Sequence, residues 1–382
     1  MATVAVEQMR PRLLTIEEAT QRLQQTEPLG VIPFSSAEKI AFRFSSGWET
    51  SLEATPPTEA VDAFVTVDGD EHQLTREGVE QVAGLVNISK KNLKTLPANI
   101  TEQAMNYFYD NMGEQAYNML TVKGLGSAFT NRSVVPFSTL QLFEQTIEGI
   151  HSKYAGAEIL VDYKFQNTLS ETNINLIVPA NERFITGGAM GDIPAGERDV
   201  WSAGIHLTNS LSAKSPTAIE SYLFRWWCTN GAIESLGSVG TWNRRSNGQT
   251  EGVYSWAKDS VKEVLDGMET RFSKIQRLTE IEMQGANTGE VLRQIFNEYK
   301  VPLAQRESVQ NTLLDADAIT MYTVMNAITQ SANNVDAARA HSLMRIGGNI
   351  PNSVYDSDRA RVWKEGNSSG PGSKNPYEIR MD

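Results

Sequence analysis

The sequence predicts an α+β protein in which a mixed, mostly antiparallel sheet packs with helices and is followed by an all-helical region. Between residues 58 and 250, short segments alternate apolar and polar residues and are separated by glycine-rich turns, which is typical of strands with one solvated face. Between residues 251 and 350, apolar residues instead recur every three or four positions, the period of packed helices. We therefore expect an N-terminal arm or linker over 1–57, a core domain over 58–250, a helical region over 251–350 and a flexible C-terminal tail over 351–382.

The N-terminal part of the chain predicts few regular elements. One helix fits Ile16 to Gln25, and the pair Pro56-Pro57 excludes regular structure at the end of the arm. Ala63 to Val67 is expected to form a strand, Asp68-Gly69 a hairpin turn, and Thr75 the cap of a following helix. This part of the core domain should therefore run strand, turn, helix.

The rest of the core domain alternates strands and helices irregularly. Ser138 to Gln141 has the pattern of a capping box and opens a helix. Residues 158–165 and 172–178 predict an antiparallel hairpin, and further strands are expected over 200–208 and 221–229. Because the helices do not follow each strand in turn, the pattern favours an α+β core over a doubly wound sheet.

The helical region ends with glycine. Helices fit residues 319–330 and 335–346, and Gly347-Gly348 is expected to end the second of them as a left-handed cap. Beyond Asn352 the residues are too polar to be buried.

Composition limits the class of protein. The 382 residues exceed the size at which one core usually keeps growing, so we expect more than one packed region. A net charge of −12 excludes a protein that coats duplex DNA by bulk positive charge. The chain has one cysteine, no apolar signal segment at its beginning and no apolar run long enough to cross a membrane. We therefore expect a cytoplasmic protein without a membrane partner.

The segment from residue 200 to 250 differs chemically from the rest of the chain. It holds four basic residues against two glutamates, so 4 minus 2 gives +2, and it holds four of the seven tryptophans. Guanidinium groups beside aromatic faces are what single-stranded nucleic acid binds. The residues that we predict as its contacts are Arg225, Trp226, Asn230, Trp242, Arg244, Arg245, Lys214 and Asn209.

An alternative applies to this segment. Adjacent residues on a strand point to opposite faces, so Trp226 or Trp227 is expected to fill the core rather than contact a ligand. Asn209 and Asn230 would likewise be ordinary turn residues.

No catalytic or metal-binding constellation stands out in the sequence. Cys228 has no histidine at a spacing that would activate a nucleophile. The glycine-rich segments lack the Gly-Lys-Ser/Thr ending of a phosphate-binding loop. The histidines lack the spacing that metal ligation on one helix needs; they are His72, His151, His206 and His341. We expect no enzyme activity, no metal and no cofactor.

Four strings of residues carry a resemblance to a known family. They are Gly204-Ile-His-Leu-Thr-Asn-Ser210, Leu223-Phe-Arg-Trp-Trp-Cys-Thr-Asn-Gly231, Met325-Asn-Ala-Ile-Thr329 and Gly347-Gly348. Together they resemble the phage- and plasmid-borne family called domain of unknown function 932, over roughly residues 70–350. The resemblance implies a protein of a mobile element in a bacterial host, encoded near replication and recombination genes. The mixed core also invites a comparison, at the level of fold, with Rad52-like single-strand annealing proteins.

Two functions follow as competing hypotheses. The first is a non-enzymatic homo-oligomer that binds, and anneals, single-stranded DNA in replication or recombination. The second is a structural or assembly protein of the virion, with phage structural partners and a location in the particle. A nuclease is a third class, for which the sequence offers no cluster of metal-binding carboxylates.

Overall fold

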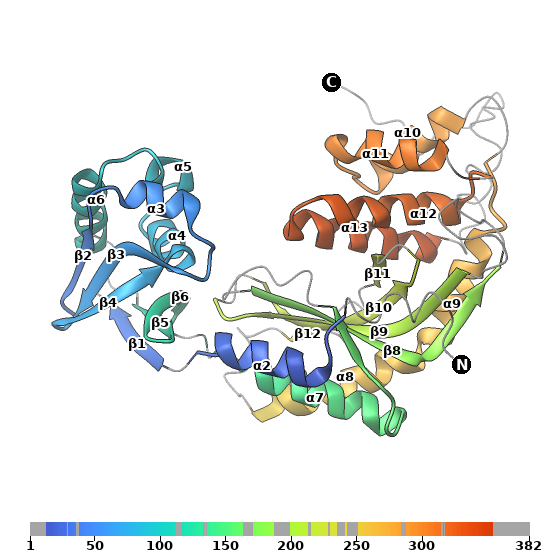
Figure 1. Cartoon of the computed structure of the whole chain (residues 1–382), viewed down its shortest axis with the longest axis horizontal. Coiled ribbons are helices and arrows are strands. Elements are labelled where there is room, and N and C mark those ends of the chain that lie inside the picture. The colour runs from blue at the N-terminus through green and yellow to red at the C-terminus, as the bar shows by residue number, and fades with distance from the viewer. Residues whose placement is uncertain are drawn as a thin grey trace.

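The computed structural model describes residues 13–28, 30–35, 38–111, 116–132, 134, 136–162, 171–186, 199–212, 215–227, 230–234, 241–242, 251–283, 288–314, 316 and 318–353. In this part of the chain the strands form two six-stranded sheets with helices packed around them (Figure 1). Nearly all strand pairs are antiparallel, so the predicted α+β class is confirmed.

The first sheet and its helices form what we call the N-terminal unit, over residues 30–131. Its strand order is β1-β5-β6-β4-β3-β2, in which the β4–β6 pair is parallel. Its core includes Phe34, Trp48 and Val79. Its elements are β1 (Gly30–Ser35), β2 (Ile40–Phe44), α3 (Trp48–Ala54), β3 (Ala60–Val67), β4 (Asp70–Thr75), α4 (Arg76–Leu85), α5 (Lys90–Leu93), α6 (Ala98–Asp110), β5 (Ala116–Val122) and β6 (Leu125–Asn131).

The expected arm over 1–57 requires correction, because β1, β2 and α3 belong to this sheet unit. Pro33 lies in β1, and proline is tolerated there because β1 is an edge strand. The aromatic residues Phe34, Phe42 and Trp48 are at most 2% exposed, and they bury these short segments against the rest of the unit. The predicted helix near Ile16 is confirmed as α2 (Ile16–Thr26), which packs in the core of the second sheet through Ala19 and Leu23.

The second sheet and its helices form what we call the C-terminal unit, over residues 13–28 and 136–353. Its strands run in the order β11-β10-β9-β8-β7, with β12 paired to the start of β10. The predicted hairpin is confirmed as the antiparallel pair β7–β8. The strands are β7 (Leu160–Asp162), β8 (Glu171–Ile185), β9 (Asp199–Ser210), β10 (Thr217–Arg225), β11 (Asn230–Glu234) and β12 (Thr241–Trp242).

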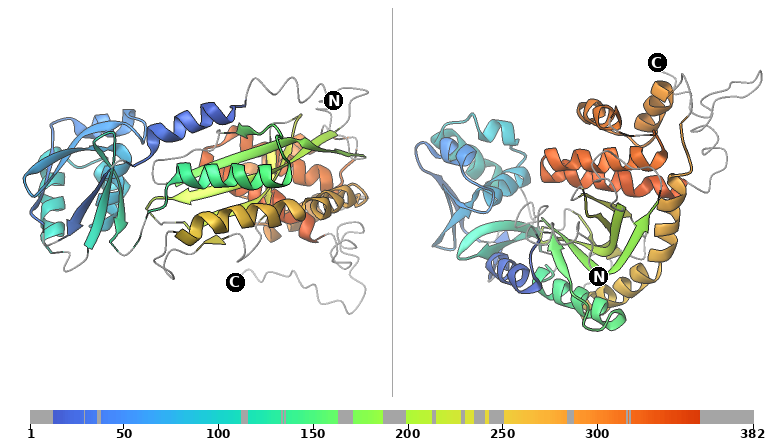
Figure 2. Two further views of the ribbon diagram at one scale, coloured as in Figure 1. Left: turned by 90° about the horizontal axis from the view of Figure 1, so that it is seen from below. Right: turned by 45° about the vertical axis from the view of Figure 1, so that its right-hand side comes forward.

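Helices cover both faces of this sheet (Figures 1 and 2). On one face lie α7 (Thr139–Lys153) and α8 (Glu251–Asp266), which run in parallel, and α9 (Met268–Leu278) continues from α8 around the sheet. On the other face lie α12 (Met321–Gln330) and α13 (Ala337–Asn349), with α10 (Thr288–Glu298) and α11 (Leu303–Leu314) outside them. The short helices η2 (Ser331–Asn334) and η3 (Ile350–Ser353) flank α13. The predicted helical region over 251–350 thus shares one core with the sheet.

The backbone of helix α13 packs directly against the backbone of strand β11. A Cβ atom added to Gly348 would lie 2.1 Å from the carbonyl oxygen of Ile233 in β11, and one added to Gly347 would lie 2.2 Å from the Thr329 side chain. Both glycines lie inside α13 rather than after it, so the predicted left-handed cap is wrong and the pair instead permits close packing. Glycine inside a helix costs roughly 1 kcal/mol relative to alanine, which this contact must offset.

Within the described residues, no helix is both long enough and apolar enough to cross a membrane.

Candidate functional site

The structure divides the predicted contacts between the two ends of strand β10. Arg225, Trp226 and Asn230 lie at its C-terminal end, whereas Asn209 and Trp242 lie near Thr217 at its beginning. Eight residue steps separate these ends, which corresponds to about 26 Å. Lys214, Arg244 and Arg245 lie outside the described residues. The five described residues of this set therefore do not form one site.

Arg225 lies in the core. Its side chain is 0% exposed, and Nε donates to both carboxylate oxygens of Asp199, at 2.9 and 3.1 Å. The Tyr322 hydroxyl donates to the same carboxylate, and Trp201 Nε1 donates to that hydroxyl at 2.8 Å. Burial and the Asp199 charge raise the pKa of Tyr322 well above its usual value, so the phenol keeps the proton that it donates. The prediction that Arg225 contacts a nucleic acid is therefore wrong, because its guanidinium is buried in an ion pair with Asp199.

Trp226 is also buried, with 0% exposure. Its ring meets Phe224 edge to face at 5.1 Å between ring centroids, and Nε1 donates to Ser202 Oγ at 2.7 Å. The alternative in which this tryptophan fills the core is confirmed. The backbone of Asn230 in β11 pairs with that of Arg225 in β10. The side chain of Asn230 is not among the parts of the chain that the structure describes.

Asn209 connects the sheet to helix α7. Its Nδ2 donates to the Phe137 carbonyl at 3.0 Å and to Thr139 Oγ1 at 2.8 Å, and its Oδ1 accepts from Thr217 Oγ1 at 3.0 Å. Asn209 is 1% exposed, so its amide makes hydrogen bonds inside the protein and is not accessible to the edge of a base. This also corrects the prediction for Asn209.

Trp242 is the predicted aromatic contact that stays partly exposed. Its ring lies 5.6 Å from that of Trp256 in α8, and β12 holds it beside Thr217. Helices α7 and α8 begin together here, since the Ser138 backbone N–H donates to the Tyr254 hydroxyl at 3.4 Å. We call this region, formed by Trp242, Trp256, Tyr254 and Ser138, the Trp242 end.

A second polar constellation lies on the sheet face that α13 covers. Asn175, His206 and Glu220 are direct neighbours across β8, β9 and β10. From α13, His341 and Arg345 reach down to them. His206 and Glu220 are 1% and 2% exposed, so this is an interior cluster. We call it the histidine cluster.

The hydrogen bonds of the cluster define its protonation. His206 Nδ1 lies 2.6 Å from Asn175 Oδ1, and an amide oxygen accepts, so this nitrogen carries the proton. His341 Nε2 accepts from Arg345 Nε at 3.1 Å, and the same guanidinium donates to Glu220. Burial lowers the pKa of His206 well below its usual value and that of His341 to about 4, with Arg345 adding to both effects, so both rings are neutral near pH 7.

Sequence reasoning missed this cluster. His206 and His341 are 135 positions apart in the chain, and His206 is separated from its strand neighbour Glu220 by a turn. The expectation of no histidine metal site rested on local spacing, and local spacing carries no information about a helix that folds back over a sheet. The alternating polar positions Asn173, Asn175, His206 and Thr208 on facing strands are the signal that could have indicated a polar face.

Residues 178–347 match the model of one family. That family is described as a domain of unknown function (DUF932). The match begins in β8 and ends in α13, so it includes Arg225, the three groups His206, Glu220 and His341, and every residue of the Trp242 end except Ser138. The resemblance expected over roughly 70–350 is thus confirmed over 178–347. No curated protein and no solved structure matches the chain.

Proposed function

We propose that this protein binds single-stranded nucleic acid at the Trp242 end of the C-terminal unit. The observation that carries the proposal is a partly exposed tryptophan placed where two parallel helices begin. Trp242 offers an aromatic face for a base. The first N–H groups of α7 already donate within the protein, Leu140 to Glu27 Oε2 and Gln141 to Ser138 Oγ, so we assign the phosphate contacts to the basic residues near Trp242 in the sequence. The function requires no reaction at this surface, and the protein acts as a binding protein.

Basic residues flank this region in the sequence. Lys214 lies between β9 and β10, and Arg244 and Arg245 follow Trp242 directly. Because the whole chain carries −12, affinity for a polyanion must come from a local group of this kind rather than from net charge. Stacking on Trp242 would add about 1 to 3 kcal/mol per base and would tolerate any sequence.

Annealing follows from the same binding mode. A strand held through phosphate contacts and stacked bases leaves its base edges free to pair with a complement. A homo-oligomer would carry several copies of the Trp242 end and could therefore hold a longer single strand. We further propose that this binding serves the replication or recombination of a phage or plasmid.

The loss of two positive charges tests the proposal. We expect Arg244→Ala/Arg245→Ala to weaken binding of a labelled oligothymidylate about tenfold, and to lower the salt slope by roughly 1.4, since each phosphate contact on a single strand contributes about 0.7. Fluorescence anisotropy at several salt concentrations measures both quantities. A labelled oligouridylate measured in parallel distinguishes DNA from RNA.

The matched control removes two charges elsewhere. Arg293 and Arg339 have side chains 64% and 66% exposed, so Arg293→Ala/Arg339→Ala changes net charge equally and should leave binding within about twofold. The proposal fails if the wild-type protein shows no salt-dependent binding at micromolar concentration, or if both double variants weaken binding equally.

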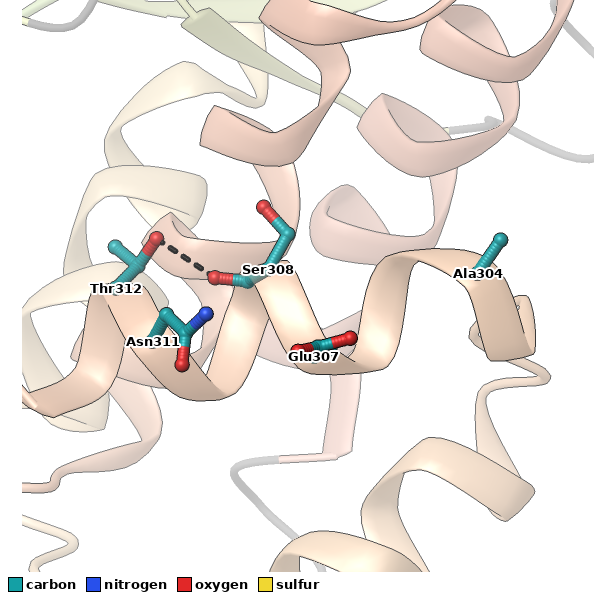
Figure 3. Close-up of a pocket in the computed structure, with 5 residues that line it drawn as sticks. All are labelled: Ala304, Glu307, Ser308, Asn311 and Thr312. Atoms are coloured by element: carbon teal, nitrogen blue, oxygen red, sulfur yellow. Dashed lines mark hydrogen bonds between the residues drawn. The ribbon is translucent and has the colours of Figure 1, made fainter.

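A second candidate function is assembly into a larger structure such as a virion, and helix α11 favours it. Leu303 and Leu314 at the two ends of this helix are 80% and 81% exposed. Between them lies an open depression of about 470 Å³, whose lining residues lie along one side of α11 (Figure 3). These lining residues are Ala304, Glu307, Ser308, Asn311 and Thr312. Exposed leucines beside an open and mostly polar surface suit contact with a second copy of the chain better than binding of a small ligand.

The assembly candidate predicts a change of mass in solution. We expect the wild-type protein to have a mass that is a multiple of 42.2 kDa by light scattering, and Leu303→Ser/Leu314→Ser to shift it to the single-chain value. Val31→Ser is the control, because Val31 is 54% exposed on the N-terminal unit and should not change the mass. A monomeric wild-type protein, and its absence from purified particles by mass spectrometry, would remove this candidate.

A further inference from the structure

We propose that His206, His341 and Glu220 bind a divalent transition-metal ion. One ligand atom from each of the three side chains lies within 4.8 Å of the others. Two neutral imidazoles and one carboxylate are a ligand set that proteins use for zinc and for non-haem iron. Metal binding in this cluster is independent of nucleic-acid binding at the Trp242 end, because the two involve different residues.

The first argument is that the two histidines turn ring nitrogens that carry no proton toward each other. His206 Nε2 and His341 Nε2 lie 3.1 Å apart. His206 carries its proton on Nδ1, and His341 Nε2 accepts from Arg345, so both Nε2 atoms present lone pairs. Thr208 Oγ1 lies 3.0 Å from His206 Nε2, but its one proton is donated to Asn173 Oδ1 at 3.0 Å. Two ring nitrogens without a proton of their own therefore lie 3.1 Å apart beside Glu220, and a cation that replaced the Arg345 donor at His341 would be coordinated by both.

The second argument is the orientation of the rings. The ring centroids lie 4.9 Å apart and the two Nε2 atoms 3.1 Å apart, with 30° between the ring planes. Since the nitrogens are closer than the centroids, the rings converge toward a common point on the Nε2 side. Two nitrogens bound to one ion at about 2.0 to 2.1 Å lie roughly 2.8 to 3.4 Å apart for angles between about 90° and 110°. The observed separation falls in this range without any movement of the rings.

The surrounding groups are those expected around a metal ligand. Asn175 accepts the His206 Nδ1 proton, which fixes the tautomer and directs Nε2 into the cluster. Glu220 is held by Arg345, so the carboxylate is oriented before an ion arrives. The ligands come from β9, β10 and α13, three elements of one core, so the site is built on rigid structure.

Arg345 controls access to the cluster. Its side chain is 34% exposed whereas that of Glu220 is 2% exposed, so Arg345 lies on the solvent side. Its Nε–H occupies the His341 lone pair that an ion needs, and its charge repels a cation. An arriving ion must displace this hydrogen bond, and the proposal leaves the contact between Arg345 and Glu220 in place. Arg345 is thus a competitor for the site and not a ligand.

Cobalt titration tests the site directly, because Co²⁺ bound by nitrogen and oxygen ligands absorbs visible light. The full-length protein, without a histidine tag and treated with a chelator, should bind one Co²⁺ per chain, and Zn²⁺ should displace it. We expect His341→Ala and Glu220→Gln each to weaken binding at least tenfold. His72→Ala is the matched control, because His72 lies on β4 of the N-terminal unit, and it should bind Co²⁺ as the wild type does.

A variant that keeps all three ligands separates metal binding from folding. Arg345→Gln should bind Co²⁺ several-fold more tightly than the wild type, because the His341 lone pair is released and a positive charge is removed. In addition, Co²⁺ should raise the melting temperature of the wild-type protein but not that of His341→Ala. The proposal is overturned if the wild type binds no stoichiometric Co²⁺ or Zn²⁺, or if Arg345→Gln binds the ion no more tightly than the wild type.

Discussion

Arg225→Leu is expected to lower the free energy of unfolding of the C-terminal unit by about 3 to 5 kcal/mol. The substitution leaves the Asp199 carboxylate in the core without its cation, and Asp199 has a side chain only 5% exposed. The Tyr322 hydroxyl still donates to it, but a neutral hydroxyl does not replace the buried guanidinium in offsetting the desolvation of this charge. Urea denaturation followed by tryptophan fluorescence and circular dichroism measures the loss.

Two further variants identify the cause of this loss. Arg183→Leu is the matched control, because Arg183 pairs with Glu269 near the surface of the same sheet, at 41% and 68% exposure, and it should cost about 1 kcal/mol or less. The double variant Arg225→Leu/Asp199→Leu should be more stable than the sum of its single effects predicts, because it removes the uncompensated charge. Equal losses for Arg225→Leu and Arg183→Leu would contradict the buried ion pair.

Trp226→Ala is expected to lower the free energy of unfolding by about 3 to 5 kcal/mol. The indole is fully buried against Phe224, so its removal leaves a large cavity in the core. The hydrogen bond to Ser202 is lost as well. Trp226→Phe should lose less, because it keeps an aromatic ring in the same space and mainly removes the N–H donor. The same denaturation experiment measures both variants.

The control and the binding assay separate a core role from a ligand contact. Phe184→Ala, at a position 41% exposed on β8 of the same sheet, should cost about 1 kcal/mol or less. If Trp226 instead stacked on a base, Trp226→Ala would weaken oligonucleotide binding and leave stability unchanged. That outcome would support Trp226 as a contact to nucleic acid and contradict its burial in the core.

Local patterns predicted the elements well. Thr75 caps α4 and Ser138 caps α7, as their positions in the sequence predicted. Such features depend on residues within a few positions of each other, so a sequence records them directly. The short strands β1 and β2 were not predicted, because a proline and a length of six residues or fewer give too weak a periodic signal.

The candidate sites were harder to predict, because burial is decided by what packs over a residue. Arg225 beside two tryptophans is equally consistent with a nucleic-acid contact and with a core ion pair. Its partner Asp199 is 26 positions away, and Tyr322 is 123 positions from Asp199. The folding of α12 over the sheet brings these groups together. In the same way, α13 brings His341 to His206 across 135 positions.

The sequence by itself determined the α+β class, most helix and strand types, the family resemblance and the concentration of tryptophan and arginine over 200–250. The tertiary structure decided which of those residues face water and which face one another. It placed Arg225 and Trp226 in the core, left Trp242 partly exposed where two helices begin, and assembled the histidine cluster. The physical reason is that periodicity is a property of neighbouring residues, whereas desolvation and coordination depend on groups that are close only in space.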